Sequence, residues 1–113
     1  MNDKKNSLVG DLLRGNTDKI LLSILMRQDS YGYRINKIMD EETNHRFSLN
    51  EATLYTTFKR LEQDDLIKSY WKESENSQPR KYYSITEKGK QELFQSKIEW
   101  KEAVDIIAHF IGE

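Results

Sequence analysis

Hydrophobic residues recur at helical spacing through the first quarter of the chain. Leu8 and Leu12 lie four positions apart, as do Ile20 and Ile24, with further leucines beside them. Gly15 and the asparagine after it interrupt the repeat, because neither residue favours the interior of a helix. The pattern therefore predicts helical structure up to residue 27, either as one helix or as two helices that break at Gly15.

A second helical segment is predicted at residues 31–42. Tyr31, Ile35 and Met39 fall on one face of this segment, and Asp29 or Ser30 is placed to act as its N-cap. A short extended stretch is expected to connect it to the next helix.

The third helix is predicted at residues 51–65, with Asn50 as its N-cap. At about 100° per residue, Leu54, Phe58 and Leu61 form one stripe, which we expect to be buried. The opposite face is small, hydroxylic and basic, and consists of Ala52, Thr56, Lys59 and Gln63, with Thr53, Tyr55 and Arg60 at its borders.

After residue 65 the pattern changes to two runs rich in β-branched and aromatic residues, 66–73 and 80–85. A polar segment with the one proline of the sequence separates them, which predicts a β-hairpin. Because neighbouring strand residues point to opposite faces, Tyr82 and Tyr83 should divide between surface and core, and Trp71 is expected to anchor the hairpin to the body. Thr86 is the expected N-cap of a final helix that runs to about Ile111. The predicted fold class is mainly α with a small β-hairpin.

The composition favours a single small domain and excludes several kinds of site. Of the 113 residues, 36% are hydrophobic and 33% are charged, which suits a domain whose apolar surface is completed by a second copy. The chain has no cysteine and two isolated histidines, so we expect no disulfide, no metal and no cofactor. Nucleophile motifs and phosphate-binding glycine loops are absent, which argues against an enzyme. The polar N-terminus and the lack of a long apolar run predict a cytoplasmic protein that does not enter a membrane.

Charge is unevenly distributed although the total is nearly neutral. Lysine and arginine number 18 and aspartate and glutamate 19, so the binding of nucleic acid would depend on a local basic surface. Residues 68–90 carry six cations and three anions, whereas residues 91–113 carry two cations and five anions. The hairpin is thus predicted to be basic and the last helix acidic.

The exposed face of the third helix has the residue types that a duplex groove requires. Short side chains let the backbone approach, hydroxyls and amides bond to base edges, and a cation binds phosphate. The simpler alternative is that this face of the third helix is only exposed to solvent and binds nothing. A helix pair followed by a hairpin is the layout of a winged helix-turn-helix, which favours DNA binding. The candidate contacts to double-stranded DNA are Asn50, Thr53, Tyr55, Thr56, Lys59, Arg80 and Lys81.

Three segments of the chain resemble one known family. LNEATLYTTFKRLEQDDLIKSYW, then RKYYSITEKGK, and YGYRI at Tyr31–Ile35 are similar to the PadR family of bacterial transcriptional regulators, in particular its short subfamily with one C-terminal helix. The resemblance implies a homodimeric winged helix-turn-helix repressor, and several members of the subfamily sense flat aromatic or cationic drugs. The chain departs from the family where Asp64 and Asp65 stand in place of a common glycine, and where the SENSQP tip lacks a glycine pair.

The last helix carries more apolar surface than its own chain is expected to cover. Leu93, Trp100 and Ile107 are seven residues apart, a spacing that suits pairing with a second copy. The alternative is that this stripe packs within one chain. The expected homodimer interface consists of Leu8, Leu93, Trp100, Ala103, Ile107, Phe110 and Ile111. The chain would then divide into a winged helix-turn-helix DNA-binding domain, residues 1–85, and a C-terminal dimerisation helix, residues 86–113.

Trp100 has a second possible role. From the sequence alone, an aromatic residue at helical spacing is either a packing residue or a platform on which a ligand stacks. The resemblance implies stacking, because drug-sensing relatives carry a tryptophan at the matching place, where the pair from two subunits sandwiches a planar compound. The expected ligand-binding residues are Trp100, Val104 and Leu12, and Glu102 or Asp105 could attract a cationic ligand.

Together these features favour a dimeric transcriptional repressor that binds an inverted repeat in DNA and is released by a small aromatic molecule. Two other hypotheses stay open: a winged helix that docks onto a protein without binding DNA, and a small-molecule carrier. Saturable duplex binding that weakens steeply with salt would separate the first hypothesis from both others.

Overall fold

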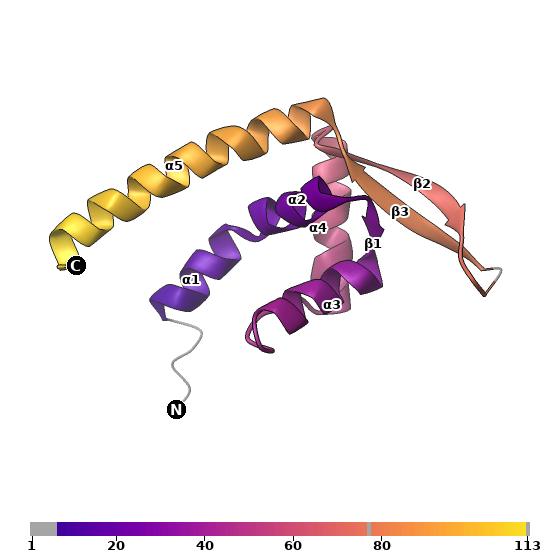
Figure 1. Cartoon of the computed structure of the whole chain (residues 1–113), viewed down its shortest axis with the longest axis horizontal. Helices are drawn as coiled ribbons and strands as arrows, with labels where there is room; N and C mark the ends of the chain where they lie inside the picture. The colour runs from indigo at the N-terminus through magenta and orange to yellow at the C-terminus, as the bar shows by residue number, and fades with distance from the viewer. Residues whose placement is uncertain (1–6, 77, 113) are drawn as a thin grey trace.

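The computed structural model describes residues 7–76 and 78–112, which form helices and one three-stranded antiparallel sheet. The elements in chain order are α1 (Leu8–Gly15), α2 (Thr17–Arg27), β1 (Ser30–Tyr31), α3 (Gly32–Glu42), α4 (Glu51–Gln63), β2 (Ile67–Glu73), β3 (Pro79–Ile85) and α5 (Glu87–Ile111). From a central body, α5 extends on one side and the β2–β3 hairpin on the other (Figure 1). We call this hairpin the wing. Among the described residues, no helix combines the length and the hydropathy needed to cross a membrane.

The N-terminal segment forms two helices, which is one of the two arrangements that the sequence leaves open. Asn16 ends α1: its backbone N–H donates to the Leu13 carbonyl (3.2 Å) and its side-chain amide to the Leu12 carbonyl (2.7 Å). Because these bonds use the carbonyls at the end of α1, the helix stops, and α2 begins at Thr17.

The sheet has a third strand that the sequence does not predict. Ser30 and Tyr31 form β1, which pairs antiparallel with Tyr83 and Tyr82 of β3. We predicted Asp29 or Ser30 as the N-cap of the second helical segment, and this prediction is wrong. Pairing with β3 keeps the chain extended through Tyr31, so the helix begins at Gly32. Tyr31 occupies the N-cap position and makes no side-chain cap bond.

The core lies where α2, α3 and α4 meet the sheet. Leu54, Phe58 and Leu61 of α4 are buried, which confirms the predicted stripe. The ring of Phe58 stacks on Tyr83 of β3, with 4.1 Å between ring centres and 20° between ring planes. This contact fixes one face of the wing against α4.

A network of backbone contacts joins α5 to the turn that follows α4. Thr86 is the N-cap of α5, as predicted: its hydroxyl accepts from the Gly89 N–H (3.0 Å) and donates to the Asp65 carbonyl (2.7 Å). Its own N–H donates to the Leu66 carbonyl (3.0 Å). Gly89 is buried against this carbonyl, and a Cβ at residue 89 would stand 2.2 Å from the Leu66 oxygen. The first turn of α5 is therefore held rigidly against the end of α4.

The two faces of the wing differ. Tyr83 is buried and Tyr82 is half-buried on the opposite face, as predicted. The prediction that Trp71 anchors the wing is wrong, because its side chain is 67% exposed. Tyr83 makes the anchoring contact instead, through its ring stacked on Phe58 of α4.

Candidate functional site

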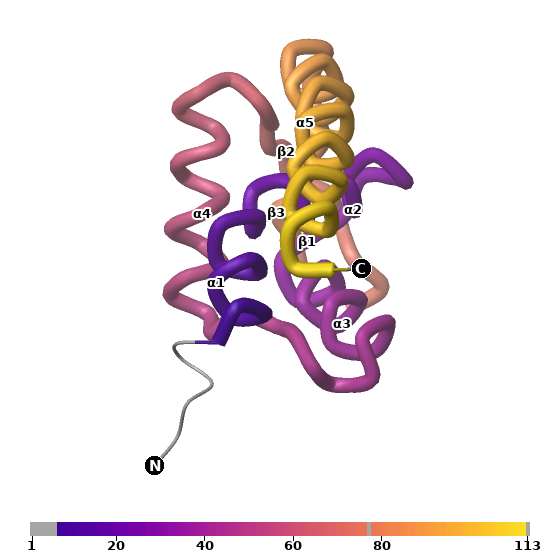
Figure 2. The backbone as a smooth tube through the Cα atoms, turned by 90° about the vertical axis from the view of Figure 1, so that its left-hand side faces the viewer, coloured from indigo at the N-terminus to yellow at the C-terminus, as the bar shows by residue number. Residues whose placement is uncertain are grey.

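The outward face of α4 is exposed along the whole helix. Seen with α5 pointing at the viewer, α4 stands at one side of the molecule and no other helix covers it (Figure 2). Ala52, Thr53, Thr56 and Lys59 all lie exposed. Asn50 is the N-cap, as predicted, and its side-chain oxygen accepts from the Thr53 N–H at 2.8 Å. These five residues form one continuous surface at the N-terminal part of α4.

Two residues at the borders of this surface also make contacts inside the chain. The ring of Tyr55 meets Phe58 edge-on, with 5.7 Å between ring centres, and its hydroxyl lies so close to Gly32 that a Cβ there would stand 2.5 Å away. Tyr55 therefore sets the approach of α3 to α4. The guanidinium of Arg60 forms an ion pair with Asp18 of α2, which draws it toward the body.

The structure separates the two cations predicted on the wing. Strand register pairs Arg80 with Lys72 and Lys81 with Trp71, and consecutive pairs point to opposite faces. Lys81 shares its face with Tyr83, the face that packs on α4. Arg80 lies on the other face. Of the two, Lys81 is thus the one on the same side of the wing as α4.

The face of the wing turned away from α4 is an aromatic cluster. Tyr82 lies 5.3 Å from Tyr31 and 5.8 Å from Tyr70, measured between ring centres. The Arg80 guanidinium stands 4.4 Å from the ring centre of Tyr31. The Tyr70 hydroxyl donates to Asp29 at 2.6 Å, and this hydrogen bond to a carboxylate raises the pKa of Tyr70 to about 12. The cluster ties the wing to β1 and so fixes its direction.

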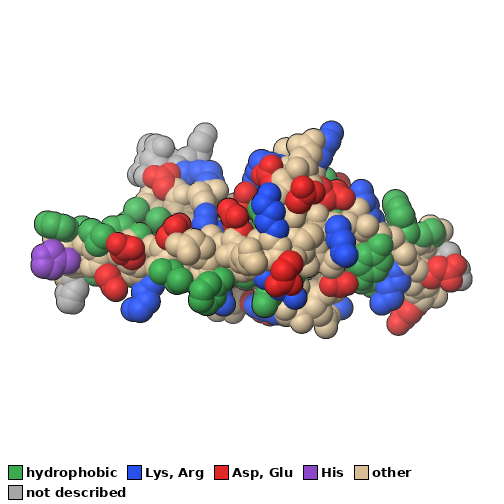
Figure 3. Space-filling view, turned by 90° about the horizontal axis from the view of Figure 1, so that it is seen from above, with side chains coloured by type: hydrophobic (Ala, Val, Ile, Leu, Met, Phe, Trp, Pro, Cys, Tyr) green, Lys and Arg blue, Asp and Glu red, His purple; other side chains and the backbone are tan. Residues whose placement is uncertain are grey.

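Hydrophobic side chains gather at the surface of α5 and are left uncovered by this chain (Figure 3). Trp100 is 45% exposed, Ile107 43% and Phe110 80%, so the stripe does not pack within its own chain. Leu93 departs from the predicted interface: it is 4% exposed and lies in the core, which leaves almost no area for a partner. The remaining predicted interface residues, Leu8, Ala103 and Ile111, are exposed.

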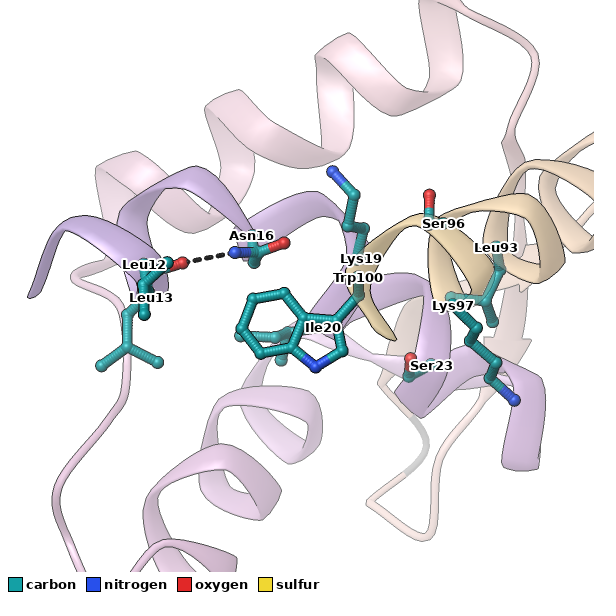
Figure 4. Close-up of a pocket in the computed structure, with 10 residues that line it drawn as sticks. All are labelled: Leu12, Leu13, Asn16, Lys19, Ile20, Ser23, Leu93, Ser96, Lys97 and Trp100. Carbon is teal, nitrogen blue, oxygen red and sulfur yellow. Dashed lines mark hydrogen bonds between the residues drawn. The ribbon is translucent and has the colours of Figure 1, made fainter. Parts of the chain in front are cut away.

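A cavity of about 320 Å³ opens between α5 and the first two helices. Of the three residues expected to bind a ligand, Trp100 and Leu12 lie on its walls and Val104 does not line it. Figure 4 shows the lining residues, which are Leu12, Leu13, Asn16, Lys19, Ile20, Ser23, Leu93, Ser96, Lys97 and Trp100.

The charge of this cavity differs from the sequence-based expectation. Its lining contains Lys19 and Lys97 and no carboxylate, and the expected acidic residues lie elsewhere, with Asp105 paired to Lys101 at 3.7 Å. Sequence reasoning missed both cavity lysines, although Lys97 is one helical turn before Trp100 and could have been placed on the same face. The chemistry suits an aromatic molecule that is neutral or acidic. Among the described residues, no group of histidine and acidic side chains is arranged to hold a metal.

Comparison with known proteins gives a consistent match. Residues 21–95 match the family described as the transcriptional regulator PadR-like family. A transcriptional regulator from Clostridium thermocellum is 40% identical, with a TM-score of 0.81 over 89% of this chain and 98% of that one. A PadR family transcription regulator from Clostridium difficile R20291 is 38% identical, with a TM-score of 0.77 over 86% of this chain and 99% of that one. Bacillus subtilis PadR, solved in complex with operator DNA, is 26% identical, with a TM-score of 0.66 over 73% of this chain and 46% of that one.

Proposed function

This chain belongs to the PadR-like family of transcriptional regulators, and from that premise we propose that it is a homodimeric repressor that leaves its operator when a planar aromatic ligand binds. Family membership makes it a DNA-binding regulator with a winged-helix fold, and not an enzyme. The rival hypothesis of a winged helix that docks only onto protein loses support, because the solved relative from Bacillus subtilis is bound to operator DNA.

DNA binding is assigned to the exposed face of α4. Thr53 and Thr56 are short enough to let the helix backbone approach base edges in the major groove, and Lys59, which is exposed on the same helix, would bind a phosphate beside the groove. Tyr55 contributes by holding α3 against α4. In this proposal residues 1–85 form the DNA-binding domain and residues 86–113 the dimerisation helix, with Thr86 at the boundary.

Dimerisation is assigned to the uncovered stripe of α5. Apolar residues spaced along one face of a helix are stabilised when a second helix removes them from water, at roughly 25 cal/mol for each Å² buried. Pairing two copies through Ile107, Phe110 and Ile111 would bury side chains that are 43%, 80% and 74% exposed here. A two-fold dimer presents two α4 helices to DNA, and its operator would be an inverted repeat.

The observation that carries the ligand proposal is the position of Trp100. Its indole lines the apolar cavity and is also 45% exposed, so it borders both the cavity and the stripe where a second copy would pack. A planar aromatic molecule that stacks on Trp100 would therefore change the contact between the two copies. Lys19 and Lys97 favour a molecule that carries a carboxylate over a cationic one.

Fluorescence and DNA binding measured on the same samples test this proposal. Naphthoate should quench the emission of the wild-type protein and of a Trp71→Phe variant, but not that of Trp100→Ala, because stacking takes place on the Trp100 indole. A cationic acridine should quench much less. Naphthoate should also weaken operator binding, and a tenfold release requires a coupling free energy of only about 1.4 kcal/mol.

Two outcomes would contradict the ligand part of the proposal. One is equal quenching in the wild-type protein and in Trp100→Ala. The other is quenching at Trp100 with no change in operator affinity. In either case the assignment as a DNA-binding regulator would stand.

A further inference from the structure

Another cavity, of about 300 Å³, opens beside β1, between the end of α2 and the side of α3. It shares no lining residue with the cavity at Trp100. Its lining consists of Ile24, Arg27, Gln28, Ser30, Arg34, Ile38 and Glu42. Cavities that bind ligands measure roughly 300–1,000 Å³, so this one has room for a small molecule only.

Ser30 contributes a buried hydroxyl that has no partner. The residue is 1% exposed, and among residues 7–76 and 78–112 no group forms a hydrogen bond with its Oγ. Strand β1 keeps the side chain in this position, because Ser30 is paired with Tyr83 of β3. Burial of a hydroxyl without a hydrogen bond costs free energy. A ligand that offers an acceptor oxygen at this point would therefore be bound by a donor that is already in place.

The charged side chains of the lining leave one cation unbalanced. Arg27 and Glu42 neutralise each other, since two guanidinium nitrogens lie 2.7 and 2.8 Å from the two carboxylate oxygens. Arg34 forms no ion pair within the described part of the chain. Its guanidinium meets the side-chain amide of Gln28 at 2.8 and 3.1 Å, where the amide oxygen is a neutral acceptor. Because a guanidinium carries five N–H donors, Arg34 retains donors for a ligand.

The charges around the lining add no excess of anions. Asp29 does not line the cavity, and its carboxylate is bonded within the aromatic cluster of the wing, which also holds Arg80 and Lys72. Further along the surface of α3, Lys37 and Glu41 carry opposite charges. The cavity and its surroundings therefore favour an anion as ligand.

We propose that this cavity binds a short aliphatic carboxylate. The carboxylate accepts hydrogen bonds from the Ser30 hydroxyl and the Arg34 guanidinium. The hydrocarbon chain lies on Ile24, which is 5% exposed, and on Ile38, which packs against the core. The lining has no aromatic side chain, unlike the Trp100 cavity, so it favours an aliphatic body over a planar ring. The inference goes beyond the proposed function and depends on neither DNA binding nor the ligand at Trp100.

Titration of the full-length, nitrogen-15-labelled protein with hexanoate, followed through the amide signals of residues 28–38, tests this site. These signals should shift and then saturate, which gives a dissociation constant for this cavity alone. Hexanamide should bind at least about tenfold more weakly, because it has the same length without the charge that Arg34 pairs with. Acetate should also bind at least about tenfold more weakly, because it has no hydrocarbon chain to bury.

Substitutions separate contacts with the ligand from structural contacts. Ser30→Ala should weaken hexanoate binding about tenfold. It should leave the thermal midpoint of the free protein unchanged or raised, because the hydroxyl has no partner to lose. Arg34→Gln should weaken binding at least about tenfold through the loss of the charge. Lys37→Gln is the matched control, since it removes a cation of the same helix that does not line the cavity, and it should change the affinity by less than about twofold.

Three outcomes would overturn the inference. If the amide signals of residues 28–38 do not shift, whether or not those near Trp100 do, the cavity holds water only. Equal affinity of the wild-type protein and Ser30→Ala would refute the role of the buried hydroxyl. An effect of Lys37→Gln as large as that of Arg34→Gln would mean that the anion is attracted to surface charge and not bound in the cavity. In each case the proposed DNA binding and the proposed ligand at Trp100 would stand.

Discussion

The replacement Gly89→Ala tests the joint between α4 and α5. The added methyl group would stand 2.2 Å from the Leu66 carbonyl oxygen and 2.7 Å from Cγ1 of Ile85. Alanine stabilises the interior of a helix by about 1 kcal/mol relative to glycine. Against this, overpacking costs about 1–3 kcal/mol, and displacing the Leu66 carbonyl from the Thr86 N–H costs about 1 kcal/mol more. The net expectation is a loss of about 2 kcal/mol in the free energy of unfolding.

Urea unfolding followed by circular dichroism measures this loss, at one fixed protein concentration because the proposed dimerisation would add to stability. Gly15→Ala is the control, since nothing lies within 4 Å of a Cβ at that position. This control should be neutral or should stabilise the protein by up to about 1 kcal/mol. If Gly89→Ala were as stable as the wild-type protein, the close packing of α5 on the turn after α4 would be refuted.

Three further predictions concern dimerisation, DNA contact and pH. Ile107→Asp should place a carboxylate in the proposed dimer interface and weaken the free energy of dimerisation by at least about 3 kcal/mol. Sedimentation should then show monomer, whereas a dimer that still binds operator would mean that the interface lies elsewhere. Lys59→Ala should weaken binding to all duplexes and lower the salt slope by about 1, whereas Thr56→Ala should change sequence preference at constant slope; unchanged affinities would contradict the α4 assignment. Burial raises the pKa of Tyr83 from 10.0 to about 12, so the stabilisation by its neutral form is complete below pH 10.0 and is lost as pH rises toward about 12. Tyr83→Phe should make the urea midpoint less sensitive to pH in that range, and an identical pH profile would refute the argument.

The elements with local signals could be predicted from the sequence. Asn50 and Thr86 are N-caps, since the side chain of each accepts a hydrogen bond from the backbone N–H three residues on. Both residue types favour this position directly before a helix, so both caps could be predicted from the sequence. The buried stripe of α4 follows from helical periodicity, and the exposed stripe of α5 from the excess of apolar residues at seven-residue spacing. The fold and the candidate DNA-binding helix were therefore within reach of local reasoning.

The features that depend on contacts distant in sequence could not be predicted. A strand of two residues has no periodicity, so the pairing of Ser30 with Tyr83 is invisible until β3 is in place. Tryptophan is a residue type that often anchors a hairpin, but Trp71 is exposed. Whether its side chain contacts the helices depends on how the wing is placed against α4, which local sequence does not show. Likewise, the close approaches of Gly32 to Tyr55 and of Gly89 to the Leu66 carbonyl involve residues more than twenty positions away.

Because the bonds of Thr86 fix α5 to the end of α4, a small rotation of the two helices moves the far end of α5 over a larger distance. A helix of 25 residues is about 37 Å long. Since its first turn is bonded to the Asp65 and Leu66 carbonyls immediately after α4, the two helices move together. A rotation of this unit by about 5° around Thr86 displaces the far end of α5 by about 3 Å. If two copies pair through the distal ends of α5 as proposed, a displacement there of less than one helical turn would change the angle at which each α4 meets DNA. In the proposed dimer, the operator spacing that the protein accepts would therefore be set at the far end of α5, more than fifty residues along the chain from Thr53 and Thr56.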